Sequence, residues 1–507
     1  MPSSTIDRRG FLKAAGAAGV ATVAAGCDYN APVPIGKVVP WLEDPVVPYE
    51  NVLPYVVQDP QLVPGNAVHF ATRCDECPAG CGVVARNREG RIVHLEGNPH
   101  DPVGGGNLCA MGTAGIQATY SPDRFKGPLK AGAEVSWDDA IQQLGAAIKG
   151  AAGAVAWVGR YRSAATGALI AQAVQAFGGR VLMWEPLGLD ALRAAVKATF
   201  GRDAIPSWHL DDAHTVLSFG ADFTTTWLSP NEQSRGWANS RDPKHGGFVS
   251  RTVVVAPRLG NSGVLADLHL APKPGTEVDV AMALARLVAD RKGYRGPAGR
   301  LLSGVDPDAA ASSAGISAER LGEVADWLAA APSVVIPGGP ADSIDPTALA
   351  TAVLVLNEVC GNIGRTVRFG DEHLVDGHAT AGDVVALLDD CRNGKVKVLF
   401  IDDLDLVYSL PESMDVQGAL ARVDHLVLLT NEPGDTTIDK AWVLPPGTTL
   451  ENWGDGNVRA GVYTLQQQAM RPLYATRSQG DVLLALARAA GVAAPAAQPA
   501  GADAAPA

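Results

Sequence analysis

The sequence predicts an α/β fold, with a small loop-rich lobe followed by two domains that are each built on a parallel sheet. From about residue 135, apolar runs of strand length alternate with longer runs in which apolar residues repeat at helical spacing. Strands that alternate with helices form parallel sheets whose two faces are covered by the helices. Before this alternation, four cysteines lie in a segment rich in glycine, which favours loops over regular elements.

Length and charge limit the possible functions. The chain has 507 residues, which is enough for about three domains and a large core. Hydrophobic residues make up 47% and charged residues 19% of it, as is typical of a globular protein. The net charge is −13, and an acidic surface repels phosphate, so we expect no nucleic-acid partner.

Residues 1–26 resemble an export signal and are set aside from the fold. Arg8 and Arg9 precede a weakly apolar stretch, as in twin-arginine signals; the alternative is an Ala-rich first helix with two chance arginines. The signal ends in Ala24-Ala25-Gly26-Cys27, which resembles a lipoprotein cleavage site. Lipidated Cys27 would anchor the mature chain to the periplasmic face of the cytoplasmic membrane. The alternative is ordinary signal cleavage beside an incidental cysteine.

The rest of the chain divides by composition. A proline-rich strap covers residues 27–70, and the cysteine-containing lobe covers residues 71–134. The first α/β domain is expected over residues 135–300 and the second over residues 301–440. A return segment that packs on the first lobe is expected over residues 441–491, and an Ala/Pro-rich tail, expected to be disordered, covers residues 492–507.

In the first α/β domain, we expect buried strands at 154–159, 215–220 and 252–256, and helices at 164–177 and about 274–290. A helical link near 307–331 leads into the second domain, with strands at 333–336, 397–401 and 425–429. Asp345 is a predicted N-cap with Pro346 in the first turn, and this helix runs to about Cys360.

Four cysteines form the most informative pattern. Cys74, Cys77 and Cys81 lie in one tight loop, and 27 residues separate Cys81 from Cys109. Thiolates are the preferred ligands of iron–sulfur clusters, and the neighbouring glycines let backbone N–H groups approach the cluster sulfurs. The pattern therefore predicts a 4Fe-4S cluster; a structural zinc site, two disulfides and an unmetallated site are the alternatives.

Beyond the cysteines, an ordered set of motifs resembles the molybdopterin oxidoreductases that bind a bis-guanine-dinucleotide molybdenum cofactor, over most of residues 70–490. The matching segments are Leu95–Val103, Tyr120–Arg124, Pro274–Glu277, Leu356–Asn357, Gly361–Arg365, Val443–Pro445 and Glu451–Gly454. Within that family, three further segments and Asp455 resemble the molybdopterin-enzyme-like half of the large periplasmic subunit of alternative complex III. These segments are Leu53–Val57, Val407–Pro411 and Tyr463–Gln468. The resemblance implies two Rossmann-like domains and electron-transfer work beside a polytopic quinol-binding membrane subunit.

Several departures from active family members lead us to expect no molybdenum cofactor and no catalytic residue. The stretch that normally supplies the metal ligand carries Glu185, and Met111 replaces the usual basic residue after the fourth cysteine. Asp222 and Ala256 alter the expected dinucleotide contacts. The match ends near residue 490, so we expect no C-terminal β-barrel cap. The closest branch also has a ferredoxin-like multi-cluster half, which we expect from a separate subunit, with cytochrome c subunits as further candidate partners.

The sequence thus predicts an iron–sulfur electron-transfer or scaffold subunit of a membrane-anchored quinol-oxidising complex. Two hypotheses compete with it: an active molybdenum or tungsten oxidoreductase, and a structural scaffold without a redox cluster. Cys360 is expected to be a buried thiol and Cys391 has no assigned role. The histidines near the cysteines, His69, His94 and His100, are expected on loops or the surface rather than as ligands.

Overall fold

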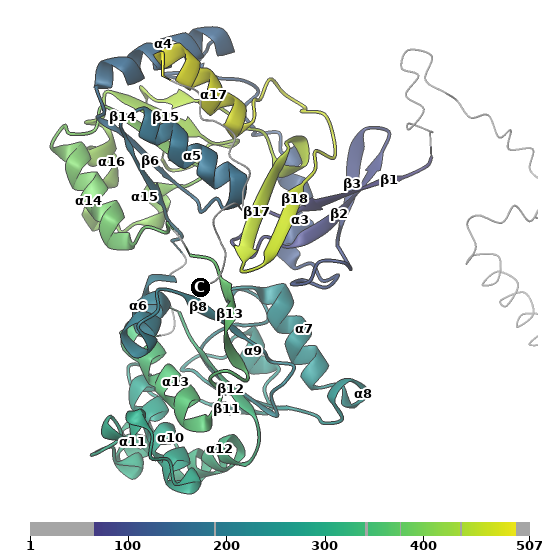
Figure 1. Cartoon of the computed structure of the whole chain (residues 1–507), viewed down its shortest axis with the longest axis vertical. Helices are drawn as coiled ribbons and strands as arrows, with labels where there is room; N and C mark the ends of the chain where they lie inside the picture. The colour runs from purple at the N-terminus through teal and green to yellow at the C-terminus, as the bar shows by residue number, and fades with distance from the viewer. Residues whose placement is uncertain (1–64, 187–188, 340–342, 376, 437–438, 493–507) are drawn as a thin grey trace, which may run out of the picture. The chain divides into compact units, whose positions relative to one another are not determined.

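The computed structural model describes residues 65–186, 189–339, 343–375, 377–436 and 439–492 (Figure 1). Cys27, the expected export signal, most of the strap and nearly all of the tail lie outside these residues. Within them, no helix is both long and apolar enough to cross a membrane.

The larger parallel sheet has seven strands in the order β5-β4-β16-β15-β14-β6-β7, and its strands from β16 to β7 are parallel. Its strands are β4 (Leu129–Lys130), β5 (Ala133–Glu134), β6 (Val155–Gly159), β7 (Arg180–Met183), β14 (Val398–Asp402), β15 (His425–Leu429) and β16 (Trp442–Val443).

Alternate residues of this sheet face two separate cores. Trp157 of β6 stacks on Phe400 of β14, with ring centroids 5.4 Å apart, on the face covered by α4 (Trp137–Ala151), α5 (Ala164–Ala176) and α17 (Gln479–Ala490). Val158 and Leu399 face the opposite core, under α14 (Ala381–Arg392) and α16 (Val416–Leu420). Because every residue of β6 and β14 is buried on one face or the other, these two strands are almost continuously apolar in sequence.

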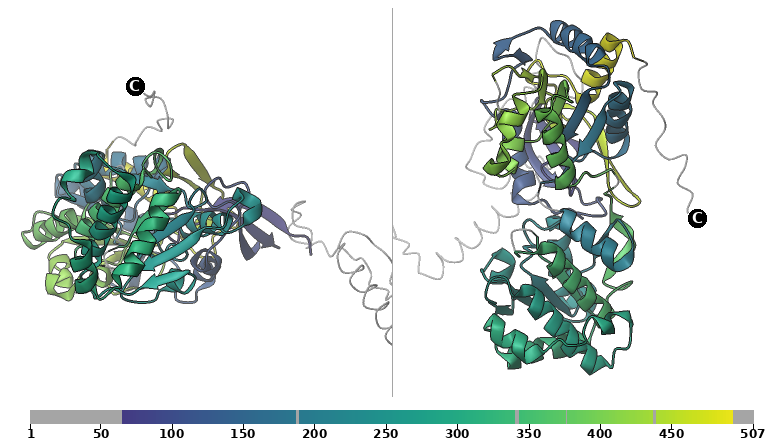
Figure 2. Two further views of the ribbon diagram at one scale, coloured as in Figure 1. Left: turned by 90° about the horizontal axis from the view of Figure 1, so that it is seen from below. Right: turned by 90° about the vertical axis from the view of Figure 1, so that its left-hand side faces the viewer.

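The second parallel sheet has the order β11-β10-β9-β12. Its strands are β9 (Thr215–Phe219), β10 (Arg251–Val255), β11 (Leu268–Leu270) and β12 (Ser333–Pro337). Around them lie α6 (Leu189–Phe200), α7 (Pro230–Ser240), α8 (Pro243–Gly246), α9 (Asn261–Val264), α10 (Glu277–Lys292), α11 (Pro307–Ala314), α12 (Ala318–Ala330) and α13 (Pro346–Cys360). Helices cover both faces of this sheet, as Figures 1 and 2 show.

The sequence correctly predicts the fold class, but the boundary at residue 300 is wrong. Strand β6 pairs with β14, which comes more than 200 residues later, while β9 pairs with β12 across the predicted boundary. The second parallel sheet and its helices are therefore inserted between β7 and β14. Strand order is decided by which apolar faces pack together, and local periodicity carries no information on it.

Two further sheets flank these domains. β1 (Val68–Arg73), β2 (Gly82–Arg88) and β3 (Arg91–Gly97) form an antiparallel sheet in the cysteine-containing lobe. The other has the order β18-β17-β13-β8, from β8 (Ile205–Trp208), β13 (Val367–His373), β17 (Gly454–Arg459) and β18 (Val462–Gln466). None of the four sheets of the described chain closes on itself. The remaining helical elements are α3 (Ala110–Tyr120), α15 (Leu406–Ser409) and the short 3-10 turns η1 (Pro297–Arg300), η2 (Glu412–Met414) and η3 (Thr449–Glu451).

The return segment contacts the cysteine-containing lobe. Arg73 donates to the carbonyl of Asp455 at 2.7 Å, and the Asn87 amide donates to the carbonyl of Ala469 at 2.7 Å. Arg124 and Glu451 form a bidentate ion pair whose side chains are both fully buried. A buried charge is tolerated only when it is paired, so this pair fixes the return segment against the cysteine-containing lobe.

The predicted start of α13 is confirmed. The Asp345 carboxylate accepts a hydrogen bond from the N–H of Ala348 at 2.8 Å, and Pro346 occupies the first helical position. Such a cap stabilises a helix by about 1 kcal/mol. The helix is buried on almost every side because it lies between the second parallel sheet and α6 and α10.

Candidate metal centre

The cysteine loop connects the first two strands of its lobe. Arg73 and Gly82 are partners in the β1–β2 register. Cys74 therefore directly follows this pair on one strand, and Cys81 directly precedes it on the other. The N–H of Cys74 donates to the carbonyl of Cys81 at 2.8 Å, which closes the loop around Cys77.

Cys109 reaches this loop as the N-cap of α3. Its Sγ accepts a hydrogen bond from the N–H of Gly112 at 3.5 Å. A Cβ atom at Gly112 would lie 3.4 Å from the Sγ of Cys74 and 2.4 Å from a Leu108 methyl group, so the first turn of α3 packs closely against the loop. The structure therefore brings together all four cysteines that the sequence singles out.

Asn231, in the first turn of α7, donates from its side-chain amide to the Sγ of Cys81 at 3.2 Å. Its side chain is buried, and α7 belongs to the inserted domain. Such donors stabilise negative charge on sulfur. Sequence reasoning missed Asn231, because an asparagine near the start of a helix is common and nothing local links it to a cysteine.

The four thiols lie in a desolvated environment. Burial raises the pKa of Cys74 and of Cys81 to about 12, and neighbouring thiols add to the rise. The pKa of Cys77 is also raised, first by burial and then by groups that include Cys109. Because buried thiolates need a nearby cation, this environment suits a metal centre that compensates their charge.

The spacing of the sulfur atoms distinguishes between metal centres. Among the described residues, no three of these sulfurs lie within 4.8 Å of one another. Sulfurs that ligate one zinc ion lie about 3.8 Å apart, given tetrahedral geometry and a Zn–S length of about 2.3 Å. The sulfurs are therefore more widely spaced than a single zinc ion requires. The described cysteines are all free thiols, and His69, His94 and His100 are exposed.

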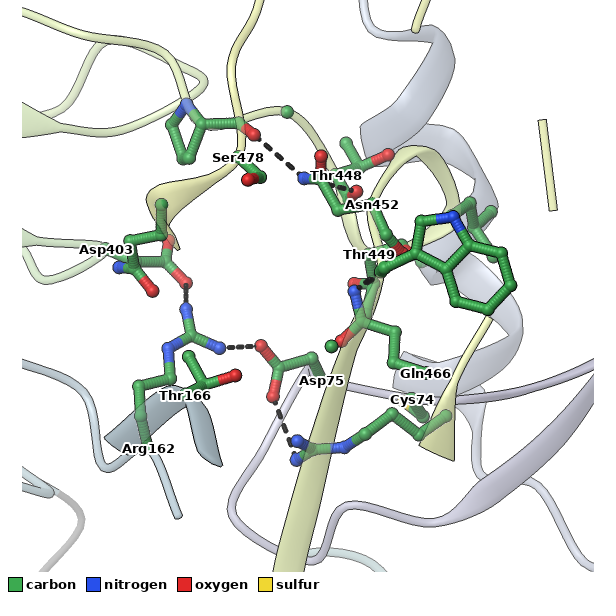
Figure 3. A pocket seen from close by; sticks show the side chains of 18 of the residues that line it. Cys74, Asp75, Arg162, Thr166, Asp403, Thr448, Thr449, Asn452, Gln466 and Ser478 are labelled. Carbon is green, nitrogen blue, oxygen red and sulfur yellow. Dashed lines mark hydrogen bonds and ion pairs between the residues drawn. The ribbon is translucent and has the colours of Figure 1, made fainter. Parts of the chain in front are cut away.

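An ion-pair network lies directly beside the thiols (Figure 3). The Asp75 carboxylate pairs with Arg162 and, at 3.2 Å, with Arg73. The Asp403 carboxylate pairs with Arg160 at 2.7 Å and with Arg162 at 3.2 Å. Burial alone would raise the pKa of Asp75, but the guanidinium groups of Arg162, Arg73 and Arg160 outweigh it and lower that pKa.

The network occupies the carboxyl edge of the larger parallel sheet. Arg160 and Arg162 follow β6, and Asp403 follows the adjacent parallel strand β14. Ligands of open α/β sheets bind in the crevice at this edge. Asp402, the last residue of β14, is fully buried there, and burial raises its pKa to about 7.

A pocket of about 630 Å³ opens over the network. Cys74 lines it, together with polar side chains of the return segment, among them Thr448, Thr449 and Asn452 (Figure 3). Its carboxylates outnumber its cationic groups: Asp75, Glu76, Asp403, Glu432 and Asp455 stand against Arg73, Arg160 and Arg162. The pocket is therefore polar and net acidic.

The structure also places the residues at which the sequence departs from active members of the family that it resembles. Glu185 is 7% exposed and lies near Cys77 and Arg160, whose pKa values it raises through its charge. The Met111 side chain is 50% exposed, at the start of α3. Cys360 and Cys391 are buried, as expected for Cys360.

At the carboxyl edge of the second parallel sheet, Asp222 accepts from the N–H and hydroxyl of Ser262, at 2.8 and 2.6 Å, and from the N–H of Asn261 at 3.3 Å. These hydrogen bonds lower the pKa of Asp222 although partial burial raises it. The start of the short helix α9 thus already has an anionic partner from this chain.

A second pocket, of about 220 Å³, lies between α7, β8, β13 and β17, and sequence reasoning missed it. In its wall Arg459 pairs with Glu232 at 2.6 Å, and His209 lies 3.1 Å from Asp371. The signals for it are single charged residues spread over about 250 positions, which no local motif connects.

Comparisons with known proteins agree with this architecture. Residues 69–121 match the molybdopterin oxidoreductase Fe4S4 domain, and residues 129–489 match the molybdopterin oxidoreductase family model. The molybdopterin-binding-like subunit of menaquinone reductase from Nitratidesulfovibrio vulgaris is 26% identical, over 95% of this chain and 72% of its own. The NADPH-Fe(3+) oxidoreductase subunit alpha of Geobacter sulfurreducens is 23% identical, over 82% of this chain and 55% of its own.

Among solved structures, acetylene hydratase from Pelobacter acetylenicus shares the fold, with a TM-score of 0.69 at 15% identity, over 83% of this chain and 69% of its own. The family model covers well over half of the sequence, and the expected resemblance is confirmed. The chain is a member of the molybdopterin oxidoreductase family and carries that family's Fe4S4 domain.

Proposed function

We propose that this chain is an iron–sulfur electron-transfer subunit of a membrane-anchored respiratory complex that works with the quinone pool, and that it has no molybdenum site of its own. Cys74, Cys77, Cys81 and Cys109 would ligate a 4Fe-4S cluster, which carries single electrons when bound. The N–H groups of Asn231 and Gly112 would then donate to ligating sulfurs and tune the potential of the cluster.

One observation carries the proposal that the bis-pterin cofactor is absent: the Asp75–Arg162–Asp403 network occupies the carboxyl edge where a dinucleotide would bind. A pyrophosphate-linked cofactor is anionic and needs free cationic or N–H groups. Here Arg160 and Arg162 are already paired within the chain, and carboxylates line the pocket in excess.

Two further contacts support the same proposal. Asp222 takes the N–H groups of Asn261 and Ser262 at the edge of the second parallel sheet, where a second nucleotide would need donors. Glu185, at the position that matches the metal ligand, lies beside Arg160 and Cys77. A carboxylate held near a guanidinium is a weaker candidate for binding a metal ion than a free one.

The sequence and one relative support the location and the partners that we propose. The twin-arginine motif and Cys27 support export and lipid anchoring at the periplasmic face. The relative from Nitratidesulfovibrio vulgaris is named as part of a menaquinone reductase, which supports a link to quinones. We propose a polytopic quinone-binding subunit and a separate multi-cluster subunit as partners, with cytochrome c subunits as further candidates. The sequence resemblance favours quinol oxidation and the relative's name favours quinone reduction.

The test is rapid-freeze EPR of the complex purified from its native membrane, after mixing with a reduced menaquinol analogue. We expect the cluster signal of this chain, identified by its loss in Cys77→Ser, to change within the turnover time. A cluster signal that stays constant while the complex turns over would contradict an electron-transfer role and favour a scaffold. Turnover that depends on added molybdate during growth would favour the competing hypothesis of an active molybdenum enzyme.

A further inference from the structure

Two large apolar side chains lie exposed at the rim of the 630 Å³ pocket. Trp453 is 68% exposed and Leu465 is 76% exposed, and both line the pocket. Asp455 of β17 is paired with Leu465 of β18, so these two share one face of the hairpin, and Trp453 directly precedes β17. Trp453 and Leu465 are called the docking rim below.

The hairpin is held firmly in place. The Asp455 carboxylate accepts from the N–H groups of Ala165 and Thr166, at 2.9 and 3.1 Å, at the start of α5. Its carbonyl accepts from Arg73, next to the cysteine loop. Exposed aromatic side chains on a rigid support are typical of the anchors that dominate protein–protein interfaces.

In the lining of this pocket, carboxyl groups outnumber guanidinium groups. Its guanidinium groups already pair with Asp75 and Asp403. Among the described residues, no ion pair involves Glu76 or Glu432, which also line the pocket. A cationic side chain that entered the pocket would meet a lining that contains these two carboxyl groups and the indole ring of Trp453, whose face a cation can also contact.

We propose that the docking rim is the binding surface for an electron-transfer partner subunit, and that a lysine or arginine side chain of this partner enters the pocket. The proposal rests on the proposed function, because Cys74 lines the same pocket and a partner seated here would lie directly against a cluster ligand. Charge complementarity selects the partner: the pocket is acidic, and a second copy of this chain, with a net charge of −13, would be repelled.

The first test is photo-cross-linking in the full-length chain within its native complex. Benzoylphenylalanine replaces Trp453 in one variant and Val264 in a control, since Val264 is also 68% exposed but lies on α9, outside the pocket. We expect the 453 probe to form an adduct with a subunit that binds a haem or iron–sulfur group, at a peptide containing lysine or arginine. Adducts with another copy, with residues 27–64 of this chain, or with no protein would overturn the proposal.

The second test measures how much Trp453 and the Glu432 carboxylate contribute to holding the partner. Complexes carrying Trp453→Ala, Glu432→Gln or Val264→Ala are washed with rising NaCl, and the retained partner is quantified. We expect Trp453→Ala to weaken retention by about tenfold, and Glu432→Gln to release the partner at lower salt than Val264→Ala does. Equal retention by all three variants would overturn the proposal. Iron content and EPR of each variant are recorded in parallel, so a lost cluster, which concerns the proposed function, is distinguished from a lost partner.

Discussion

The side-chain amide of Asn231 donates to the Sγ of Cys81 at 3.2 Å, although the two residues are 150 positions apart in the chain. This contact joins the inserted α/β domain to the cysteine loop. A donor to a ligating sulfur stabilises the reduced, more negative state of a cluster, so the contact links the packing of α7 to the potential of the metal centre.

We predict that Asn231→Ala lowers the reduction potential of the cluster by about 30–60 mV. The estimate takes one lost hydrogen bond as about 1 kcal/mol and a tenfold change in the equilibrium as 59 mV for one electron. Potentiometric EPR titration measures the shift. Asn393→Ala, at an exposed helix end, serves as the control and should leave the potential unchanged. Equal reduction potentials in the two variants would show that Asn231 does not tune the cluster.

We predict that Arg162→Gln destabilises the protein by about 3 kcal/mol, because it leaves Asp75 and Asp403 short of a partner in a largely buried network. The uncompensated negative charge near the thiols should also lower the cluster potential. Arg180→Gln breaks an ion pair with Asp390 that is more exposed and should cost less than about 1 kcal/mol. Urea denaturation and EPR titration test both variants; equal stabilities would contradict the role of the network.

We predict that the free energy of unfolding depends on pH because of Asp402. Burial raises its pKa in the folded state from 3.8 to about 7. Between pH 3.8 and pH 7, the folded state therefore keeps a proton that the unfolded state has released. The free energy of unfolding falls as the pH rises through this range toward 7. Between pH 6 and pH 8 the loss is about 1–2 kcal/mol, or about 2 °C in Tm. Asp402→Asn should lack this decrease, and an unchanged difference between the two pH values in that variant would contradict the assignment.

Glu451→Gln should cost about 3 kcal/mol of unfolding free energy at pH 7, because it leaves the fully buried Arg124 guanidinium without its charged partner. Glu323→Gln, in an exposed pair with Arg320, is the matched control and should cost under about 0.5 kcal/mol. Denaturant midpoints of the two variants provide the comparison. Similar midpoints would show that the return segment does not depend on this ion pair.

The sequence predicts the local elements well, because each has a local cause. The runs that become β6, β9 and β14 are mostly apolar and buried at every position, and Asp345-Pro346 specifies the start of α13. The cysteine spacing likewise predicts a site that the structure brings together. Each of these features depends on residues within one short stretch of sequence, and the cysteine pattern spans residues 74–109.

The long-range features could not be predicted in the same way. The pairing of β6 with β14 depends on which of several similar apolar strands pack side by side, and this separates two parallel sheets that the sequence places in succession. The network beside the thiols joins Asp75, Arg162 and Asp403 from three distant segments. Polar residues just after β6 and β14 are a usable signal for a site at this edge, but they do not reveal that the residues pair with one another.

The assignment of a 4Fe-4S cluster without molybdenum is tested most directly by the metal content of the full-length chain, purified anaerobically and compared with two cysteine variants. We predict about four irons per chain and no molybdenum in the wild type, loss of iron in Cys77→Ser, and wild-type iron in Cys391→Ala, where the thiol is buried and belongs to no ligand pattern. One molybdenum per chain, zinc in place of iron, or unchanged iron in Cys77→Ser would contradict it.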